Sequence, residues 1–202
     1  MNVFISSAGD GFVGEALRRL IKSVIQPVSV FLSGGMSIVP GVQWLSALLE
    51  AMDQSKLAVV CVTRRNVSSP WIMFEVGALM KSSIPIVPYL IDFSPIDLTG
   101  PLQNFRAVNA DREGTLELLH GINTTLVAPV MEDILNKAFD QFWPELEATL
   151  KGPEIEAVLM AQENRGVVEE SKTPSAGKQV RSEREMLEEL LERVRRLEER
   201  SS

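Results

Sequence analysis

The residues best suited to chemistry lie in one stretch, NVSSPWIMFEVGALMK, which spans residues 66–81. Its one acidic residue, Glu75, follows Trp71 by four positions, so in a helix the carboxylate lies one turn from the indole. No Lys, Arg or His stands three or four positions from Glu75, and apolar residues flank it. A carboxylate among apolar groups has a raised pKa and, while ionised, can stabilise a developing positive charge. The alternative is a solvated helix face, which these apolar neighbours disfavour.

A second candidate is the segment Gly9-Asp-Gly-Phe-Val-Gly14, which matches the G-x-G-x-x-G pattern of dinucleotide-binding loops. That pattern also needs an acidic residue at the end of the second strand to bind ribose hydroxyls, and residues 31–35 (FLSGG) contain none. A glycine-rich tight turn is therefore favoured over a nicotinamide-dependent oxidoreductase. The triphosphate-binding pattern G-x-x-x-x-G-K-[ST] does not occur in the sequence.

Metal and thiol chemistry find little support in the sequence. His120 is the only histidine and has no cluster of His or Cys around it, so we expect neither a zinc site nor a His-dependent triad. Cys61 is the only cysteine and lies in an apolar segment, which excludes an intrachain disulfide and indicates a buried thiol.

The segments that must position Glu75 alternate between short apolar runs and amphipathic runs. We predict strands at 2–6, 28–32, 57–63, 84–91 and near 105–108. Helices are predicted at 13–24, around Trp44–Met52, from Pro70, at 113–123 and at 130–150. About five strand–helix alternations indicate an α/β protein with a parallel sheet covered on both faces. In such folds ligands bind at the carboxyl ends of the strands, which here means the loops 6–12, 33–41 and 64–70.

Several residues within these segments carry finer predictions. Ser69 is expected to cap the central helix and Pro70 to be its first residue. Pro88 suggests an edge strand or a bulge, and Pro144 a break or restart of the last helix. The spacing also predicts that one stripe of the central helix faces the core. That stripe consists of Ile72, Val76, Leu79 and Met80.

The composition is typical of an ordinary soluble protein. The chain has 202 residues, a net charge of −7 and a pI near 4.9, which argues against nucleic acid as a direct partner. Its first residues carry no basic leader, and no apolar run approaches the roughly 20 residues of a membrane span. We therefore expect a cytoplasmic protein that does not bind membranes.

The character of the sequence changes after Leu150. We predict one domain over 1–150, a helix and flexible linker over 151–180, and a charged amphipathic helix over 181–202. In this last segment the apolar residues Leu187, Leu190, Val194 and Leu197 fall on the a and d positions of two heptads. A short self-associating coiled coil and a solvated helix with a weak seam both remain open.

A series of short motifs runs in order over 1–150. The motifs are VFISS (3–7), FLS (31–33), GVQW (41–44), SPWIMFEVGA (69–78), LTGPL (98–102) and FWPEL (142–146). This series resembles the TIR (Toll/interleukin-1 receptor) domain, in particular its bacterial, NAD-cleaving branch. One departure is Ser37 before Ile38, where many relatives have an acidic residue, and it leaves the details of loop assembly open.

The resemblance implies a flavodoxin-like fold of five parallel strands that cleaves the bond between nicotinamide and ribose, with NAD⁺ as substrate and no other cofactor. It implies that Glu75 is the catalytic residue. Residues 33–44 correspond to the family's BB loop, which helps to complete a neighbour's site in assemblies. The residues expected to contact or shape the substrate site are Ser6, Ser7, Asp10, Ser33, Trp44 and Trp71.

One carboxylate suffices for this chemistry. Glycoside hydrolases normally need two because an alkoxide leaving group must be protonated. Nicotinamide departs neutral from a pyridinium, so an ionised Glu75 need only hold the ribose hydroxyls and stabilise the oxocarbenium-like cation. The resemblance also suggests activation by self-assembly in bacterial defence or signalling. The rival function is a TIR interaction scaffold without catalysis.

Overall fold

The computed structural model describes residues 1–7, 11–33, 44–92, 94–98, 100–153 and 155. All of them lie in one compact unit, Met1–Glu163. Apart from residues 151–153 and 155, the linker and the amphipathic helix expected over 151–202 lie outside the described residues, as do most of the loop 33–44 and Asp10. In the described part of the chain, no helix is both long enough and apolar enough to cross a membrane.

Five parallel strands form one sheet in the order β2-β1-β3-β4-β5. The strands are β1 (Asn2–Ser6), β2 (Ser29–Leu32), β3 (Leu57–Val62), β4 (Ile86–Leu90) and β5 (Val108–Asn109). This is the flavodoxin-like order, and the predicted fold class is confirmed. The chain moves from β1 outward to β2 and then returns to β3 on the other side of β1. The strand order therefore reverses between β1 and β3, which is where such folds bind ligands.

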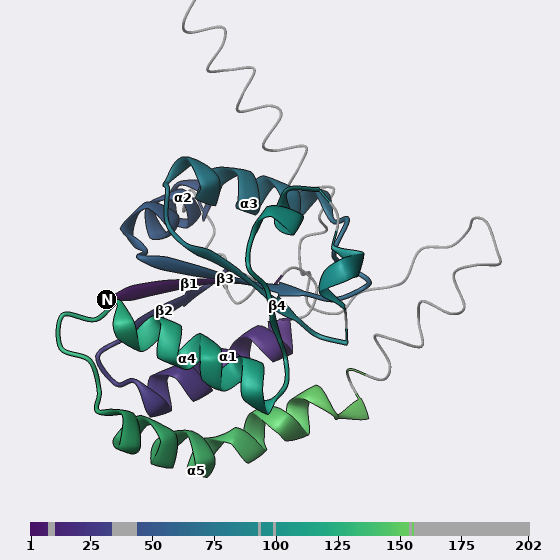
Figure 1. The fold of residues 1–202 in the computed structure, drawn as a ribbon. Coiled ribbons are helices and arrows are strands. Elements are labelled where there is room, and N and C mark those ends of the chain that lie inside the picture. Colours follow the sequence, from purple (N-terminus) through teal and green to yellow (C-terminus); the bar gives the residue numbers. More distant parts are fainter. Residues whose placement is uncertain (8–10, 34–43, 93, 99, 154, 156–202) are drawn as a thin grey trace, which may run out of the picture. The chain divides into compact units, whose positions relative to one another are not determined.

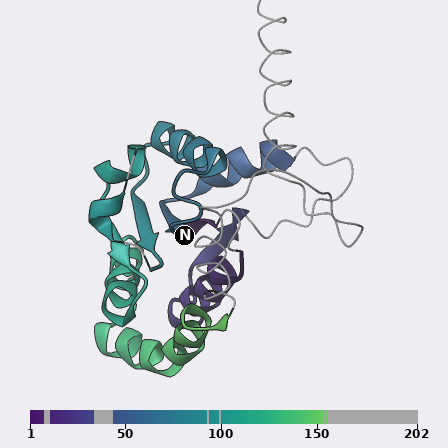
Figure 2. The same ribbon diagram turned by 90° about the vertical axis from the view of Figure 1, so that its right-hand side faces the viewer.

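Helices cover both faces of the sheet (Figures 1 and 2). They are α1 (Gly11–Val24), α2 (Trp44–Gln54), α3 (Pro70–Lys81), α4 (Arg112–Thr124) and α5 (Glu132–Leu150). Two short 3-10 helices, η2 (Pro95–Asp97) and η3 (Gly100–Asn104), lie between β4 and β5. Figure 1 shows α2 and α3 on one face and α1, α4 and α5 on the other. Helix α5 packs against α1 and α4.

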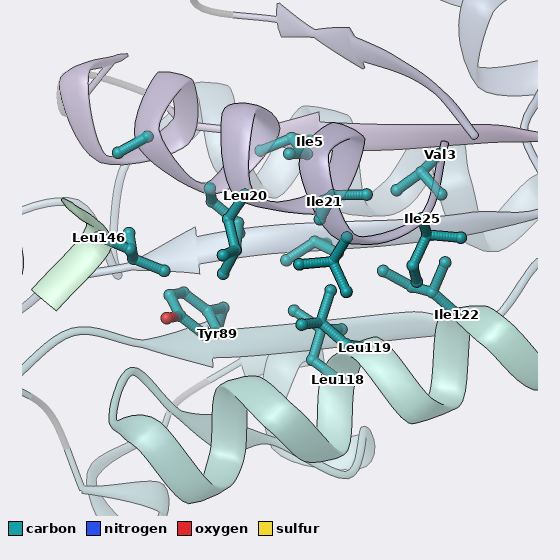
Figure 3. Close-up of a cluster of buried hydrophobic side chains, with 14 of the residues drawn as sticks. Val3, Ile5, Leu20, Ile21, Ile25, Tyr89, Leu118, Leu119, Ile122 and Leu146 are labelled. Carbon is teal, nitrogen blue, oxygen red and sulfur yellow. The ribbon is translucent and has the colours of Figure 1, made fainter. Parts of the chain in front are cut away.

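The two faces of β1 follow from the alternation of side chains along a strand. Val3 and Ile5 belong to the buried cluster that β1 shares with α1, α4 and α5. Figure 3 shows this cluster, with Tyr89 of β4 among the labelled side chains. Phe4 and Ser6 alternate with these residues and therefore face α2 and α3. Phe4 is fully buried there and stacks on Phe31 of β2, with ring centroids 5.5 Å apart.

The structure corrects some boundaries and one burial prediction. Helix α1 begins at Gly11 instead of residue 13, and β5 spans Val108–Asn109 instead of residues 105–108. Met80 does not belong to the core-facing stripe of α3, because it is 49% exposed while Ile72, Val76 and Leu79 are fully buried. Met80 precedes Lys81, the last residue of the helix.

Pro88 lies inside the sheet without forming a bulge. It pairs in register with Val60 of β3, whereas β5 pairs only with Tyr89 and Leu90. The Ile91 amide donates to Val62 of β3, so Tyr89 and Val87 also present their amides to β3 and Pro88 faces the other way. Its missing N–H therefore points to the side where β5 has not yet begun, and no ladder hydrogen bond is lost.

Pro144 does not break the last helix, and that prediction is wrong. Helix α5 runs through Pro144 from Glu132 to Leu150. Because Pro144 has no N–H, the carbonyl of Asp140 loses its intrahelical hydrogen-bond partner. Both residues are exposed, and water can bind this carbonyl instead. The opposite side of the helix is buried through Leu135, Phe139, Trp143 and Leu146. This burial holds the helix together across the proline.

We expect Pro144→Ala to stabilise the protein by about 2 kcal/mol. It restores one helical hydrogen bond and removes a steric conflict worth about 3 kcal/mol, while the greater freedom of the unfolded chain offsets up to about 1 kcal/mol. Urea unfolding measures the change. Gln141→Ala, an exposed substitution in the same helix, is the control, with an expected change within about 0.5 kcal/mol. An unchanged or lowered stability of Pro144→Ala would mean that the proline relieves strain in this helix.

Candidate functional site

Helix α3 begins at a turn that its own side chains hold in place. Ser69 is the N-cap, and its hydroxyl accepts a hydrogen bond from the Trp71 amide at 3.2 Å, with Pro70 as the first helical residue. Both predictions are confirmed. Asn66, 4% exposed, braces the turn before it: its Oδ1 accepts from the Thr63 amide at 2.8 Å, and its Nδ2 donates to the Cys61 carbonyl at 3.1 Å. The turn from β3 into α3 is thus fixed by a buried amide.

Glu75 lies in the second turn of α3 and is completely buried. This excludes the solvated helix face that the sequence left open. The Ser6 hydroxyl, at the end of β1, donates a hydrogen bond to Glu75 Oε2. Because β1 pairs with β3 and β3 leads into α3, this bond joins two elements at the point where the strand order reverses. Two residues that are 69 positions apart in sequence therefore meet at the carboxyl edge of the sheet.

Burial dominates the ionisation of Glu75. Desolvation raises its pKa, the Ser6 hydrogen bond and then the nearby polar groups of Ser33 and Trp71 lower it by less, and the net result is a rise from 4.5 to about 7. Among the described residues, no charged group contributes to this shift. In the part of the chain that the structure describes, Glu75 Oε1 accepts no complete hydrogen bond, although Ser33 and Trp71 lie near the carboxylate. At neutral pH the group is thus divided between its acid and its carboxylate.

The two serines that end β1 point in opposite directions. Ser6 contacts Glu75, whereas Ser7 packs against α1. A Cβ atom on Gly14 would lie only 2.7 Å from both Ser7 Cβ and Ser7 Oγ, and equally close to Leu32. Gly14 is therefore needed for close packing between α1 and the end of β1. This explains the last glycine of the G-x-G-x-x-G segment without a bound dinucleotide.

The structure brings some of the predicted site residues together and leaves others apart. Ser6, Ser33 and Trp71 surround the Glu75 carboxylate. Trp71 is 5% exposed, and its ring lies 5.3 Å from that of Phe74. Ser7 is turned to the other face. Asp10 lies outside the described residues, and Trp44 is described only as the first residue of α2, without its side chain.

Sequence reasoning assigned no role to Asn66. The signal was present, since an asparagine shortly after a strand commonly hydrogen-bonds to the backbone of a turn. The prediction of a buried thiol is confirmed for Cys61, which is 0% exposed. Among the described residues, no group of three or more His, Cys, Asp and Glu side chains is arranged to hold a metal ion.

This arrangement can serve one kind of chemistry well. Ser33 Oγ and Glu75 Oε1 are buried and have no hydrogen-bond partner among the described residues. A buried polar atom without a hydrogen-bond partner is costly, and such atoms can mark a site that binds a ligand or takes part in catalysis. In the described ranges, no cation contributes to the electrostatics of the carboxylate either. A ligand that brings hydroxyl donors and a positive charge to Glu75 would satisfy both needs.

The raised pKa of Glu75 makes folding depend on pH. Because the folded pKa of about 7 lies above the ordinary 4.5, the protonated form is favoured by folding. The associated stability is fully present below pH 4.5 and is lost as the pH rises through 7, by about 3 kcal/mol in all. Glu75→Gln stays neutral, so relative to it the wild type should lose most of this amount between pH 5 and 8.

Urea unfolding of both proteins at several pH values measures that difference. Glu132→Gln removes a glutamate that is exposed at the start of α5 and controls for the change in net charge. A difference between wild type and Glu75→Gln that stays constant with pH would contradict the burial of an ionisable carboxyl group.

The close contact at Gly14 predicts opposite effects for two glycines. Gly14→Ala forces Ser7 and Leu32 aside, and we expect a loss of about 1–3 kcal/mol in the free energy of unfolding. Gly77 of α3 is the matched control, because its added Cβ would meet no atom within 4 Å. Gly77→Ala should stabilise the protein by about 0.5–1 kcal/mol through helix propensity. Equal effects of the two substitutions in thermal unfolding would contradict the packing described at Gly14.

Comparison with known proteins agrees with the geometry. Residues 3–119 match the model of the family described as the TIR domain. No curated protein matches the chain significantly. Among solved structures, a match of 18% identity is a chain from "Structure of the activated Roq1 resistosome directly recognizing the pathogen effector XopQ (TIR domains)". It covers 81% of this chain and 98% of that chain, with a TM-score of 0.39. Since the family model spans more than half of the 202 residues, the chain belongs to the TIR domain family.

Proposed function

We propose that this TIR domain is an NAD⁺ nucleosidase in which Glu75 is the catalytic residue. The observation that supports this most directly is the buried carboxylate where the strand order reverses. Ser6 donates to Oε2, and Oε1 has no hydrogen-bond partner within the part of the chain that the structure describes. The reaction cleaves the bond between the nicotinamide nitrogen and C1′ of the ribose. Water then adds at C1′, releasing nicotinamide, ADP-ribose and a proton, or an adenine nitrogen of the same molecule attacks instead and gives a cyclic product.

The transition state of this reaction matches what Glu75 can offer. As the C–N bond breaks, the bonding electrons move to the nicotinamide ring, which leaves neutral, and positive charge develops on the ribose. An ionised carboxylate in a site without water stabilises that charge far more than it would in bulk water. Oε1, which has no partner among the described residues, can also accept a hydrogen bond from a ribose hydroxyl. Neither a metal ion nor a second cofactor is required by these steps.

Substrate binding itself favours the active ionisation state. The free carboxyl group has a pKa of about 7, so a large fraction of it is protonated at neutral pH. The nicotinamide ring of NAD⁺ carries a positive charge, and a positive charge within a few ångströms lowers the pKa of a carboxyl group. Bound NAD⁺ would thus complete the ionisation of Glu75.

We further propose that self-association controls access to Glu75, in a bacterial defence or signalling role in the cytoplasm. In the single chain the side chain is 0% exposed, so substrate reaches it only after neighbouring residues move. Contacts between copies supply a reason for that movement. The predicted contributors are the BB loop, residues 33–44, and the C-terminal helix over 181–202. Ser7, Asp10, Ser33, Trp44 and Trp71 stay predicted substrate contacts.

The decisive experiment measures nicotinamide release from NAD⁺ by the purified chain over a wide range of protein concentration. We expect turnover that rises more steeply than linearly with concentration and falls by at least about 100-fold in Glu75→Gln. Glu132→Gln is the matched control and should keep full activity, because it changes the same charge on an exposed surface. Turnover that persists in Glu75→Gln would overturn the assignment of the catalytic residue.

The pH dependence of this turnover provides an independent check. Because only the ionised form of Glu75 acts, kcat/KM should fall as the pH drops below about 7, which is the pKa of the free protein. The acidic fall of kcat should lie at a lower pH than that of kcat/KM, since the bound cation lowers the pKa of Glu75. Profiles of kcat and kcat/KM that coincide would contradict a charge interaction between substrate and Glu75.

The alternative function is an interaction scaffold without catalysis. Complete burial of Glu75 favours it, because a core residue that never meets substrate would look the same. In that case neither dilute nor concentrated protein would release nicotinamide. NAD⁺ would also leave the pH dependence of unfolding unchanged. A catalytic site would instead show a stability that rises with NAD⁺ concentration in a non-hydrolysing Glu75→Gln protein.

A further inference from the structure

We propose that Ser6 is a positioning residue that holds Glu75 through Oε2 and leaves Oε1 for the substrate. This assigns Ser6 a role different from the substrate contact that the sequence suggested. The assignment of Oε1 to a substrate rests on the proposed function. The contact between Ser6 and Glu75 does not, since it is present in the protein alone.

The hydrogen-bonding capacity of Ser6 is already used. A serine hydroxyl has a single O–H donor, and that of Ser6 is directed at Glu75 Oε2. An acceptor on the substrate would have to compete for this hydrogen with the anionic oxygen of Glu75. The anionic oxygen is the stronger acceptor. Ser6 is also 0% exposed, so it has no surface that a ligand can reach in this state.

The position of Ser6 on the sheet makes it a rigid support. It is the last residue of β1, an internal strand paired with β2 on one side and β3 on the other. In register it lies beside Val60 in the middle of the fully buried β3. Helix α3, which carries Glu75, begins after the turn that Asn66 braces. Both ends of the Ser6–Glu75 contact are therefore anchored, as a preoriented carboxylate requires.

The charges around Glu75 give Ser6 its importance. Strands β1 and β2 carry no ionisable side chain. Strand β3 carries the Cys61 thiol, which lies in the cluster on the opposite face of the sheet. The only other charged residue of α3 is Lys81, at its end. In α2, Glu50 and Asp53 lie in the carboxyl-terminal half. Among the described residues, the Ser6 hydroxyl is accordingly the largest influence that favours the ionised form of Glu75.

The test compares Ser6→Ala with wild type in NAD⁺ turnover across pH. At pH 9, above both limbs, we expect kcat to fall about tenfold and KM to change less than about twofold. The acidic limb of kcat/KM should move up by about one pH unit, since a lost hydrogen bond disfavours the carboxylate. Ser6→Thr keeps the hydroxyl and should restore the limb. A raised KM with an unmoved limb would show a substrate contact. Lower stability with an unmoved limb would show a structural role. Either result overturns the proposal.

A second measurement does not depend on turnover. Carbon-13 labelling of the side-chain carboxyl groups lets NMR follow the titration of Glu75 in the substrate-free protein. Its midpoint should lie near pH 7 in wild type and about one pH unit higher in Ser6→Ala. The control Ser55→Ala also removes a buried hydroxyl, which donates to Ala51 at 2.7 Å, and should leave the midpoint unchanged.

The two readouts separate the two proposals. A shifted midpoint in a protein that releases no nicotinamide would support the positioning contact and reject the proposed function. An unshifted midpoint would overturn the positioning role whatever the turnover. If Ser6→Ala does not fold, Ser6→Cys replaces it, because a thiol is a weak hydrogen-bond donor and should raise the midpoint in the same direction.

Discussion

The constraint on which this structure depends is the burial of one carboxyl group between β1 and α3. An ionised carboxylate is costly to remove from water, and among the described residues only neutral groups compensate for that cost. Ser6 can reach Glu75 because the chain crosses back past β1 before entering β3 and α3. The bracing of the turn by Asn66 and the capping of α3 by Ser69 set the position at which Glu75 arrives. Topology, turn and helix start thus all determine one contact.

Most of the fold could be predicted from the sequence, because its signals are local and repeated. Apolar β-branched runs such as Leu57–Val62 and helical spacing such as that of Ile72, Val76 and Leu79 are determined by whether a face is buried. The Ser69–Pro70 start of α3 depends only on local backbone groups. The importance of Glu75 was visible for a similar reason, since an unpaired acidic residue among apolar ones stands out.

What the sequence did not reveal depends on contacts between distant segments. The continuity of α5 through Pro144 follows from its packed face, which outweighs the local effect of a proline. The different roles of Ser6 and Ser7 follow from the alternation of side chains along β1. The sequence shows this alternation, but it does not show which helices cover each face of the strand. The partner of Glu75 was not predictable by spacing, because 69 residues separate it from Ser6.

The alternation along β1 has a consequence for how this protein can change over generations. An insertion or deletion of one residue within Asn2–Ser6 reverses every side chain beyond it. Such a change would remove the hydroxyl from Glu75 and would also take Ile5 out of the cluster beneath the sheet. The support of the carboxylate and the hydrophobic core are therefore inherited together. A descendant whose first strand differs in length by one residue would lose both.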